Sequence, residues 1–462
     1  MPSFRPTAVS AIIGAALAAT QVAGQRPTLG DFLKHATLDN GFQVVVAENH
    51  AVPLATVLVA VHNGAMTQEG RDQGLAHLYE HLLFRSYEKD PAAFAQEATY
   101  LDADYNGSTS EEVVTYYLVL PSKNAVKGIA LLAHLLQKPR FNERDLAEER
   151  GVVLDELQRA ESDPEQALDR LASRLLWGAS WSRKDVGGDS GSLKGISLDQ
   201  LRTAYARYYV PNNSALIVTG DVSSENMVAA ARDQFGAWPQ APDPFVDMPI
   251  PPIAQMTASS AALMAKPVAH ATIMLKYRGP SAERDTTAPF AAAALCEVLN
   301  ERGSLFQHHL VASGIFQSIS CSYLTMAHVG PITFQGETSP NSVRPALAAL
   351  LEELDHLGHL EGVTDEDLLI VRKRLQVRTA LEFESSYALA LRLAFWWALG
   401  GADTYARYDG RVGAQSLDDL RQFVGTYVAL RPKVIGVLAP PAAIQGLQAL
   451  LGAASGSQKS PR

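Results

Sequence analysis

Residues 74–84, which read GLAHLYEHLLF, decide how this sequence folds and what it can bind. Their apolar residues recur at helical spacing, which predicts an α-helix. His77 and His81 are four residues apart, so both imidazoles leave one face of that helix and can hold one ion. Glu80 stands beside His81, where its carboxylate is near the ion and free to exchange protons with a bound water. This arrangement is typical of a hydrolytic metal site.

A catalytic zinc ion takes three protein ligands and keeps a fourth position open for water. A second helix, predicted over 143–160, supplies Glu156 as the candidate third ligand. Glu149 is seven residues earlier on the same face, where a carboxylate can orient a ligating histidine. Two alternatives stay open. The histidines could be a partly buried or surface pair, and the acidic residues could belong to an ordinary charged helix face.

Composition limits the class of protein. Of 462 residues, 47% are apolar and 19% are charged, which indicates a globular chain long enough for two large domains. The net charge of -10 argues against a nucleic-acid partner, because phosphate binding needs concentrated Lys and Arg. Only Cys296 and Cys321 are present, too few for a thiolate zinc cage. We predict two buried small side chains, whose spacing leaves their pairing open.

Residues 1–24 are predicted to be a signal peptide. Arg5 precedes a small, apolar run over 8–19, and Val22 and Gly24 have the spacing of a signal-peptidase site. The run is too short to span a bilayer, which needs about 20 helical residues, so we predict no stable membrane anchor. The alternative is an N-terminal anchor. A cleaved leader predicts a periplasmic or secreted protein.

Six prolines between positions 239 and 252 divide the chain, because neither a helix nor a central strand can run through them. We therefore predict an N-terminal domain over 30–238, which carries the candidate zinc ligands, and a Pro-rich linker over 239–256. A C-terminal homologous domain without the zinc motif is expected over 257–450, and a flexible tail over 451–462.

Sequence repeats support the duplication. The tripeptide Ser-Leu-Asp at position 197 recurs at 416, an offset of 219, and Arg-Asp-Leu at 144 is echoed by Glu-Asp-Leu at 366, an offset of 222. Strand and helix patterns alternate within the first half, which predicts an α+β fold. The strands are expected over 42–47, 55–61, 115–120 and 215–219, and the helices over 74–84, 124–137 and 143–160.

Three motifs together resemble the pitrilysin/insulinase family of zinc metallopeptidases, and most closely its mitochondrial-processing-peptidase-like and bacterial two-domain members. They are the inverted motif at 77–81, the acidic helix at 149–156, and the pair Tyr-x-Pro-Asn at 209 with Val-x-Gly-Asp-Val at 218. The resemblance runs from about residue 38 to 439. It implies two homologous α/β-roll domains, each a mixed or antiparallel sheet with helices packed on it, which together form half of a clam-shell chamber.

The resemblance also implies residue roles. Zinc, one ion per chain, would be held by His77, His81 and Glu156, with Glu80 as general base and Glu149 as a supporting acid. Asn106 and Gly107 resemble the family's Asn-Ala segment near the substrate backbone, although glycine replaces the alanine here. The substrate peptide would extend along a sheet edge.

One departure concerns the second half. Family members often carry an Arg and, seven residues later, a Tyr that assist the substrate carbonyl, and this sequence has Leu310 and Gln317 there. We therefore expect a homodimer, or a heterodimer in which a related subunit without zinc supplies the Arg and Tyr. His308 and His309 are an alternative source of donors.

The function expected from these residues is a zinc metalloendopeptidase that cleaves unfolded peptides or small proteins after export. The alternatives are a non-catalytic subunit of a heterodimeric processing-peptidase-like complex and a subunit that binds peptide without cutting it.

Overall fold

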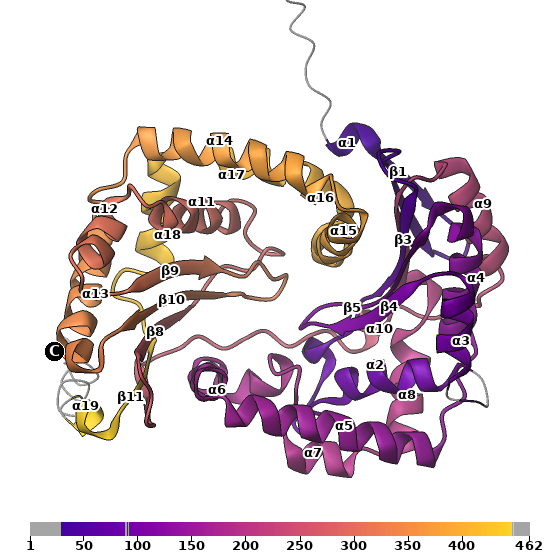
Figure 1. Ribbon diagram of the computed structural model, residues 1–462, viewed down its shortest axis with the longest axis horizontal. Helices are drawn as coiled ribbons and strands as arrows, with labels where there is room; N and C mark the ends of the chain where they lie inside the picture. The colour runs from indigo at the N-terminus through magenta and orange to yellow at the C-terminus, as the bar shows by residue number, and fades with distance from the viewer. Residues whose placement is uncertain (1–28, 88–89, 91, 446, 448–462) are drawn as a thin grey trace, which may run out of the picture.

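The computed structural model describes residues 29–87, 90, 92–445 and 447, and within them the chain forms two mixed sheets covered by helices (Figure 1). The expected signal peptide and C-terminal tail lie outside the described residues. The first sheet has the strand order β1-β2-β6-β3-β5-β4, and the second has the order β7-β11-β8-β10-β9. These two sheets with their helices confirm the α+β fold.

The strands of the first sheet are β1 (Leu33–Thr37), β2 (Gln43–Glu48), β3 (Leu54–Val61), β4 (Asp104–Thr109), β5 (Val114–Pro121) and β6 (Ser214–Gly220). Those of the second are β7 (Ser260–Ala265), β8 (Ala271–Arg278), β9 (Ser318–Tyr323), β10 (Pro331–Thr338) and β11 (Val434–Ala439). In each sheet one pair is parallel, β2 with β6 and β7 with β11, and the other neighbours are antiparallel. Strand β7 therefore corresponds to β2, β11 to β6, β8 to β3, β10 to β5, and β9 to β4.

The helices of the first half are α1 (Leu29–Phe32), α2 (Leu75–Arg85), α3 (Ala93–Tyr100), α4 (Ala125–Gln137), α5 (Glu143–Ser162), α6 (Pro164–Trp177), α7 (Ser190–Gly195), α8 (Leu198–Tyr208) and α9 (Ser224–Phe235). The predicted linker contains one short helix, α10 (Pro244–Asp247), which we did not expect there; its proline stands at the first helical position, where a missing N–H is tolerated. The helices of the second half are α11 (Ala288–Asn300), α12 (Leu305–Gln307), α13 (Val343–Gly358), α14 (Asp365–Glu382), α15 (Ser386–Gly400), α16 (Ala402–Ala406), α17 (Tyr408–Gly413), α18 (Leu417–Tyr427) and α19 (Pro441–Gln445). Short 3-10 turns occupy Ala65–Thr67, Ser122–Asn124, Gly178–Arg183, Pro211–Asn213 and Pro340–Ser342, and a π-helical turn occupies His308–Ala312.

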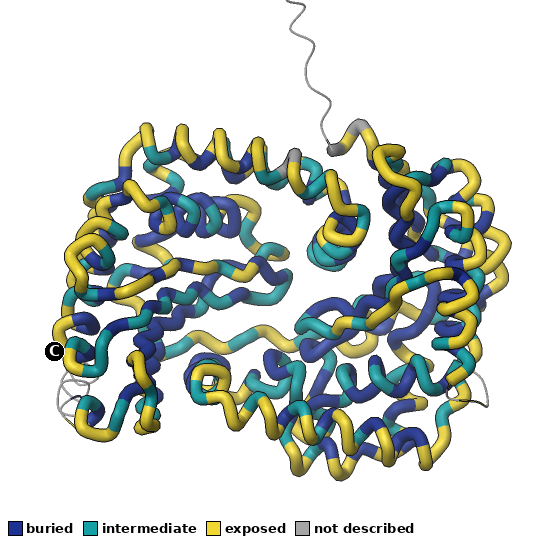
Figure 2. The backbone as a smooth tube through the Cα atoms, viewed as in Figure 1, coloured by how far each residue is buried: buried dark blue, intermediate teal, exposed yellow. Residues whose placement is uncertain are grey.

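The two halves exchange a helix. α15 of the second half covers one face of the first sheet, where Leu389 and Leu393 join the core of Leu58 and Ala60. α6 of the first half likewise packs on β7, β8 and β11, placing Leu168 in a shared core (Figure 1). Because α4 covers the opposite face of the first sheet, β3 is buried from residue 55 to 61 on both sides. Figure 2 shows this burial along the central strands, with exposed residues on the outer faces of α5 and α14.

The elements predicted in the first half are confirmed to within two residues at each end, because their apolar periodicity matches the faces that they bury. Cys296 and Cys321 are buried as expected, on α11 and β9 respectively. Their pairing, which the spacing had left open, is now given: they form a disulfide with a Cα–Cα distance of 5.0 Å. No helix among the described residues is long and apolar enough to cross a membrane.

Candidate metal centre

Helix α2 presents its apolar side to the core of the first half and its histidines to the α5 side. Leu78 and Leu82 are fully buried. The helix begins after Gly74, whose φ of 86° is a left-handed conformation that suits glycine. The Gln68 side-chain oxygen accepts hydrogen bonds from the backbone N–H groups of Gly74 and Ala76, at 3.0 and 3.3 Å. Gln68 therefore caps the turn of helix that carries the first histidine.

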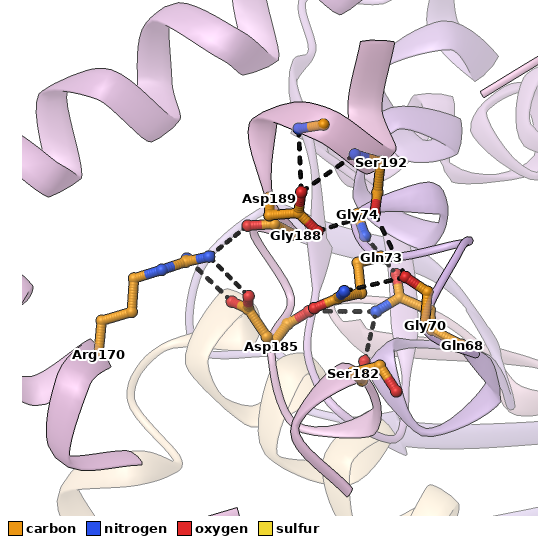
Figure 3. A network of polar contacts seen from close by, with 11 residues as sticks. Gln68, Gly70, Gln73, Gly74, Arg170, Ser182, Asp185, Gly188, Asp189 and Ser192 are labelled. Carbon is orange, nitrogen blue, oxygen red and sulfur yellow. Dashed lines mark hydrogen bonds and ion pairs between the residues drawn. The ribbon is translucent and has the colours of Figure 1, made fainter. Parts of the chain in front are cut away.

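A polar network holds this cap in place (Figure 3). The Gln68 side-chain amide donates to the carbonyls of Ser182 and Asp185, at 2.9 and 3.1 Å. From α6, Arg170 donates to both carboxylate oxygens of Asp185, at 3.0 and 2.7 Å, and to the carbonyl of Gly188. Burial raises the pKa of Asp185 to about 6, although the Arg170 charge opposes this shift. The network fixes the start of α2 against the segment 182–188 and against α6.

Three side chains converge between α2 and α5. The Nε2 atoms of His77 and His81 are 3.3 Å apart, and the nearer Glu156 oxygen is 3.8 Å from the first and 3.6 Å from the second. Among the described residues, these three form the only group of at least three His, Cys, Asp or Glu whose donor atoms all lie within 4.8 Å of one another. The chain thus brings together the three residues that the sequence proposed as ligands.

This donor set fits a zinc ion. Zn–N bonds of about 2.0–2.1 Å at tetrahedral angles separate two ligand atoms by roughly 3.3 Å, close to the spacing of the three donors. Burial, and then the charge of His81, lower the pKa of His77 to about 4, which keeps its imidazole neutral as a ligand must be. A tetrahedral ion bound by these three groups has one open position.

Glu149 supports the cluster from behind. Its Oε2 atom lies 3.3 Å from Nδ1 of His81, and its Oε1 atom lies 3.5 Å from Nε of Arg85, one turn further along α2. Burial acts to lower the pKa of His81, but the hydrogen bond to Glu149 and the nearby carboxylates outweigh it and raise the pKa. Glu149 therefore contacts a histidine of the cluster without being one of the three donors.

Glu80 is buried next to the donors but outside the cluster. Its Oε2 atom accepts a 2.7 Å hydrogen bond from the hydroxyl of Thr109, at the end of β4. Burial raises the pKa of Glu80, and the Thr109 hydrogen bond opposes the shift. A Cβ added at Gly107 would lie 2.7 Å from both Cγ and Oε1 of Glu80, so the glycine leaves room for this carboxylate.

Asn106 and Gly107 lie on β4, the edge strand that follows β5 in the sheet. Asn106 is exposed, and its side-chain oxygen accepts from the backbone N–H of Gly107 at 2.9 Å. The strand has one neighbour, so its outer backbone groups are available for pairing with an extended peptide. The substrate-binding role of the two residues stays a prediction.

A cavity of about 660 Å³ adjoins the cluster and is formed by both halves. His77 and Glu156 line it from the first half, together with residues of α6, and Leu324, Met326 and Pro331 line it from the second. A peptide that reached the cluster would therefore contact both halves.

Sequence reasoning missed the residues that hold this site together. Gln68, Thr109 and Arg170 reach it from separate elements, and no local spacing marks them. Leu310, at the position where the resemblance led us to expect an arginine, is buried in the second core, and Gln317 is exposed. His309 pairs with Glu353 at 2.7 Å on the second half.

Two family models match this chain. The model described as Insulinase (Peptidase family M16) matches residues 43–183, and the model described as Peptidase M16 inactive domain matches residues 195–375. The chain belongs to the M16 peptidase family. The first of these two ranges contains His77, His81 and Glu156, and the second begins within the first half, before α8.

Relatives within M16 include proteins named as zinc proteases. The chain is 24% identical over 420 residues to an uncharacterized zinc protease of Streptomyces coelicolor, covering 88% of this chain and 90% of that protein. It is 21% identical over 419 residues to a probable mitochondrial-processing peptidase subunit beta of Arabidopsis thaliana, covering 87% and 78%. The resemblance seen in the motifs is confirmed.

Solved structures share the fold. A protease from Helicobacter pylori matches with a TM-score of 0.78 and 20% identity, over 88% of this chain and 99% of that chain. The periplasmic protease PqqL from Escherichia coli matches with a TM-score of 0.74 and 19% identity, over 94% of this chain and 51% of PqqL. The fold of this chain thus matches about half of PqqL.

Proposed function

We propose that this M16 protein is a zinc-dependent metalloendopeptidase that hydrolyses peptide bonds in unfolded peptides or small proteins. The convergence of His77, His81 and Glu156, with Glu80 beside them and outside the donor set, is the observation that carries this proposal. The relatives named as zinc proteases support it.

The geometry supports a role for each of these residues. His77, His81 and Glu156 would hold zinc, and Glu149 would keep His81 in the orientation that presents Nε2. Zinc, when bound, would polarise the scissile carbonyl and lower the pKa of a coordinated water to about 7. Glu80 takes the proton from the attacking water and returns it to the leaving amine, and its raised pKa suits both transfers. Thr109 holds the Glu80 carboxylate in place.

The proposal includes a partner. Leu310 and Gln317 supply no guanidinium or phenol for the oxyanion, and losing one such donor costs about 10²–10³ in turnover. A second chain, either a copy of this one or a related subunit without zinc, would complete the chamber, and the related subunit would supply the missing Arg and Tyr. The correspondence with about half of PqqL supports an assembly of two such chains.

We also propose a periplasmic or secreted location. The disulfide between Cys296 and Cys321 supports it, because such bonds persist in oxidising compartments. PqqL is named as a periplasmic protease, which is consistent with this location.

The test is hydrolysis of an unstructured peptide by the zinc-loaded chain, alone and with added partner, followed by mass spectrometry of the products. We expect internal cleavage, lowered by about 10²–10⁴-fold in Glu80→Gln, which should keep its zinc. Peptide and zinc binding without cleavage would instead favour the peptide-binding alternative. Cleavage by Glu80→Gln at the full rate would contradict the proposed role of Glu80.

A further inference from the structure

The cavity beside the candidate metal centre contains several charged side chains, and most of them are already paired. Lys276 lies 2.5 Å from Asp169 and donates to the Ser173 hydroxyl at 2.7 Å. Arg170 pairs with Asp185, as Figure 3 shows. These two ion pairs cancel their own charges and offer little to a ligand.

Lys184 is also satisfied. It is buried, donates to the carbonyl of Val329 at 2.7 Å, and lies over the Trp177 ring at 4.9 Å. Its neighbour Glu112 is used in the same way: its carboxylate accepts from the backbone N–H groups of Ala327 and His328, at 2.7 and 3.0 Å. Both side chains therefore bind the backbone of residues 327–329 in the second half to the first half.

Glu111 is different. It lines the cavity together with His77 and Glu156, yet within the described part of the chain no other side chain donates a hydrogen bond to its carboxylate and no cation lies within 4.0 Å of it. Burial raises the pKa of Glu111, and the charges of Lys184 and Lys276 only partly oppose the shift. Once a metal ion neutralises Glu156, Glu111 is the one lining carboxylate in this part of the chain left without a cation of its own.

Part of the wall of this cavity is apolar. Val153, Leu157 and Ala160 lie on one face of α5 and line the cavity. Trp177 and Trp181, which are outside α5, line it as well. Such a wall suits the methylene stem of a long basic side chain, which buries its stem and carries its charge at the tip.

We propose that Glu111 binds the ammonium or guanidinium group of a Lys or Arg side chain close to the scissile bond of the substrate peptide. The stem of that side chain lies along the α5 wall. The inference rests on the proposed peptidase function, because it places a substrate side chain in the cavity beside the metal centre. It makes Glu111 a specificity-determining residue and predicts cleavage near basic positions.

The first test measures binding, so that it does not depend on turnover. The protein is the zinc-loaded Glu80→Gln chain, and the reference ligand is a neutral peptide that contains norleucine residues. Its affinity is compared with that of peptides in which one norleucine at a time is replaced by Lys or by Glu. Fluorescence anisotropy with labelled peptides gives the dissociation constants. We expect Lys at one position to tighten binding about tenfold or more over norleucine, as for a partly desolvated charged hydrogen bond.

The matched variants are Glu80→Gln/Glu111→Gln and Glu80→Gln/Glu143→Gln, the latter changing an exposed carboxylate at the start of α5. The first should bind Lys and norleucine peptides equally, with unchanged affinity for the neutral peptide and unchanged zinc content. The second should keep the preference. Equal affinity in both variants and the parent, or a preference for Glu that Glu111→Gln leaves intact, would overturn the proposal.

Hydrolysis by the chain with native Glu80 separates this inference from the proposed function. A Glu111-dependent preference for Lys in binding, without cleavage of any peptide, would refute the peptidase and keep the cation site. Cleavage that ignores the charge of the flanking residues would keep the peptidase and refute the cation site.

Discussion

The two halves of this chain share the order of five strands, but different side chains occupy the space between the two corresponding helices of each half. In the first half, α2 and α5 bring two imidazoles and a carboxylate together, and this donor group contains no Lys or Arg side chain. In the second half, the corresponding helices α11 and α14 carry Glu297 and Arg378, 2.5 Å apart, and Asp409 of α17 lies 3.5 Å from the same guanidinium. The second half supplies a cation as a side chain at this place, whereas the first half has a donor group that could hold a metal ion.

The edge strands differ as well. In the first half a hydrogen bond from Thr109 of β4 holds Glu80 of α2, whereas in the second half the disulfide joins α11 to β9. A carboxylate that accepts a hydrogen bond can still take up and release protons. The sulfur atoms of a disulfide cannot. The comparison teaches that the same strand arrangement carries the candidate metal centre in one half and a covalent cross-link in the other.

The largest expected effect within this comparison follows from Glu149→Ala. Without its carboxylate, Nδ1 of His81 loses its partner, and the zinc affinity should fall by about 10–100-fold. Competition with a chelator measures it. The control is Glu297→Ala, which removes an acid from α11 in the second half and should leave the zinc affinity unaltered. Equal losses in the two variants would break the comparison.

Gly107→Ala is expected to act on turnover alone. The added Cβ would displace the Glu80 carboxylate, and a shift of about 1 Å in a catalytic group can cost up to about 10²-fold in kcat. The control is Ser320→Ala on the corresponding edge strand β9, which should leave kcat unchanged. Steady-state kinetics with metal analysis checks both, and an unchanged kcat in Gly107→Ala would show that Glu80 has room to move.

A pH effect is expected from the second half. Burial raises the pKa of Asp409 to about 6 from its ordinary 3.8, against the opposing charge of Arg378. The folded chain therefore holds this proton more tightly than the unfolded chain, and stability from Asp409 is greatest below about pH 4 and falls as the pH rises to about 6. Compared with Asp409→Asn, the natural chain should lose about 2 kcal/mol across that window.

Denaturant unfolding at several pH values gives this difference. A natural chain whose stability relative to Asp409→Asn rises with pH would contradict the sign.

Arg378→Ala should have the smallest effect. It leaves Glu297 and Asp409 without their cation, but the arginine side chain is 41% exposed, so we expect a loss of about 1 kcal/mol in the free energy of unfolding. Urea unfolding measures it, with the exposed Arg421→Ala as a control near zero. An unchanged zinc content in Arg378→Ala would support the comparison, and a loss of the native zinc would contradict it.

The sequence predicted what depends on local periodicity. The spacing of His77, His81 and Glu156 marks helix faces, and the offsets of the repeats indicated a duplication that the matching strand orders display. It could not predict the helix exchange, because α6 and α15 carry no mark of which sheet they cover. Thr109, Gln68 and Glu111 were missed for the same reason: their roles come from tertiary contacts between distant segments.

The central claim is that one half of this chain holds a metal and the other replaces it with a guanidinium. Metal analysis of the purified chain tests it most directly, beside His77→Ala and Arg378→Ala. We predict about one zinc per chain in the natural protein and in Arg378→Ala, and close to none in His77→Ala. Zinc retained in His77→Ala, or two zinc ions per natural chain, would contradict the account.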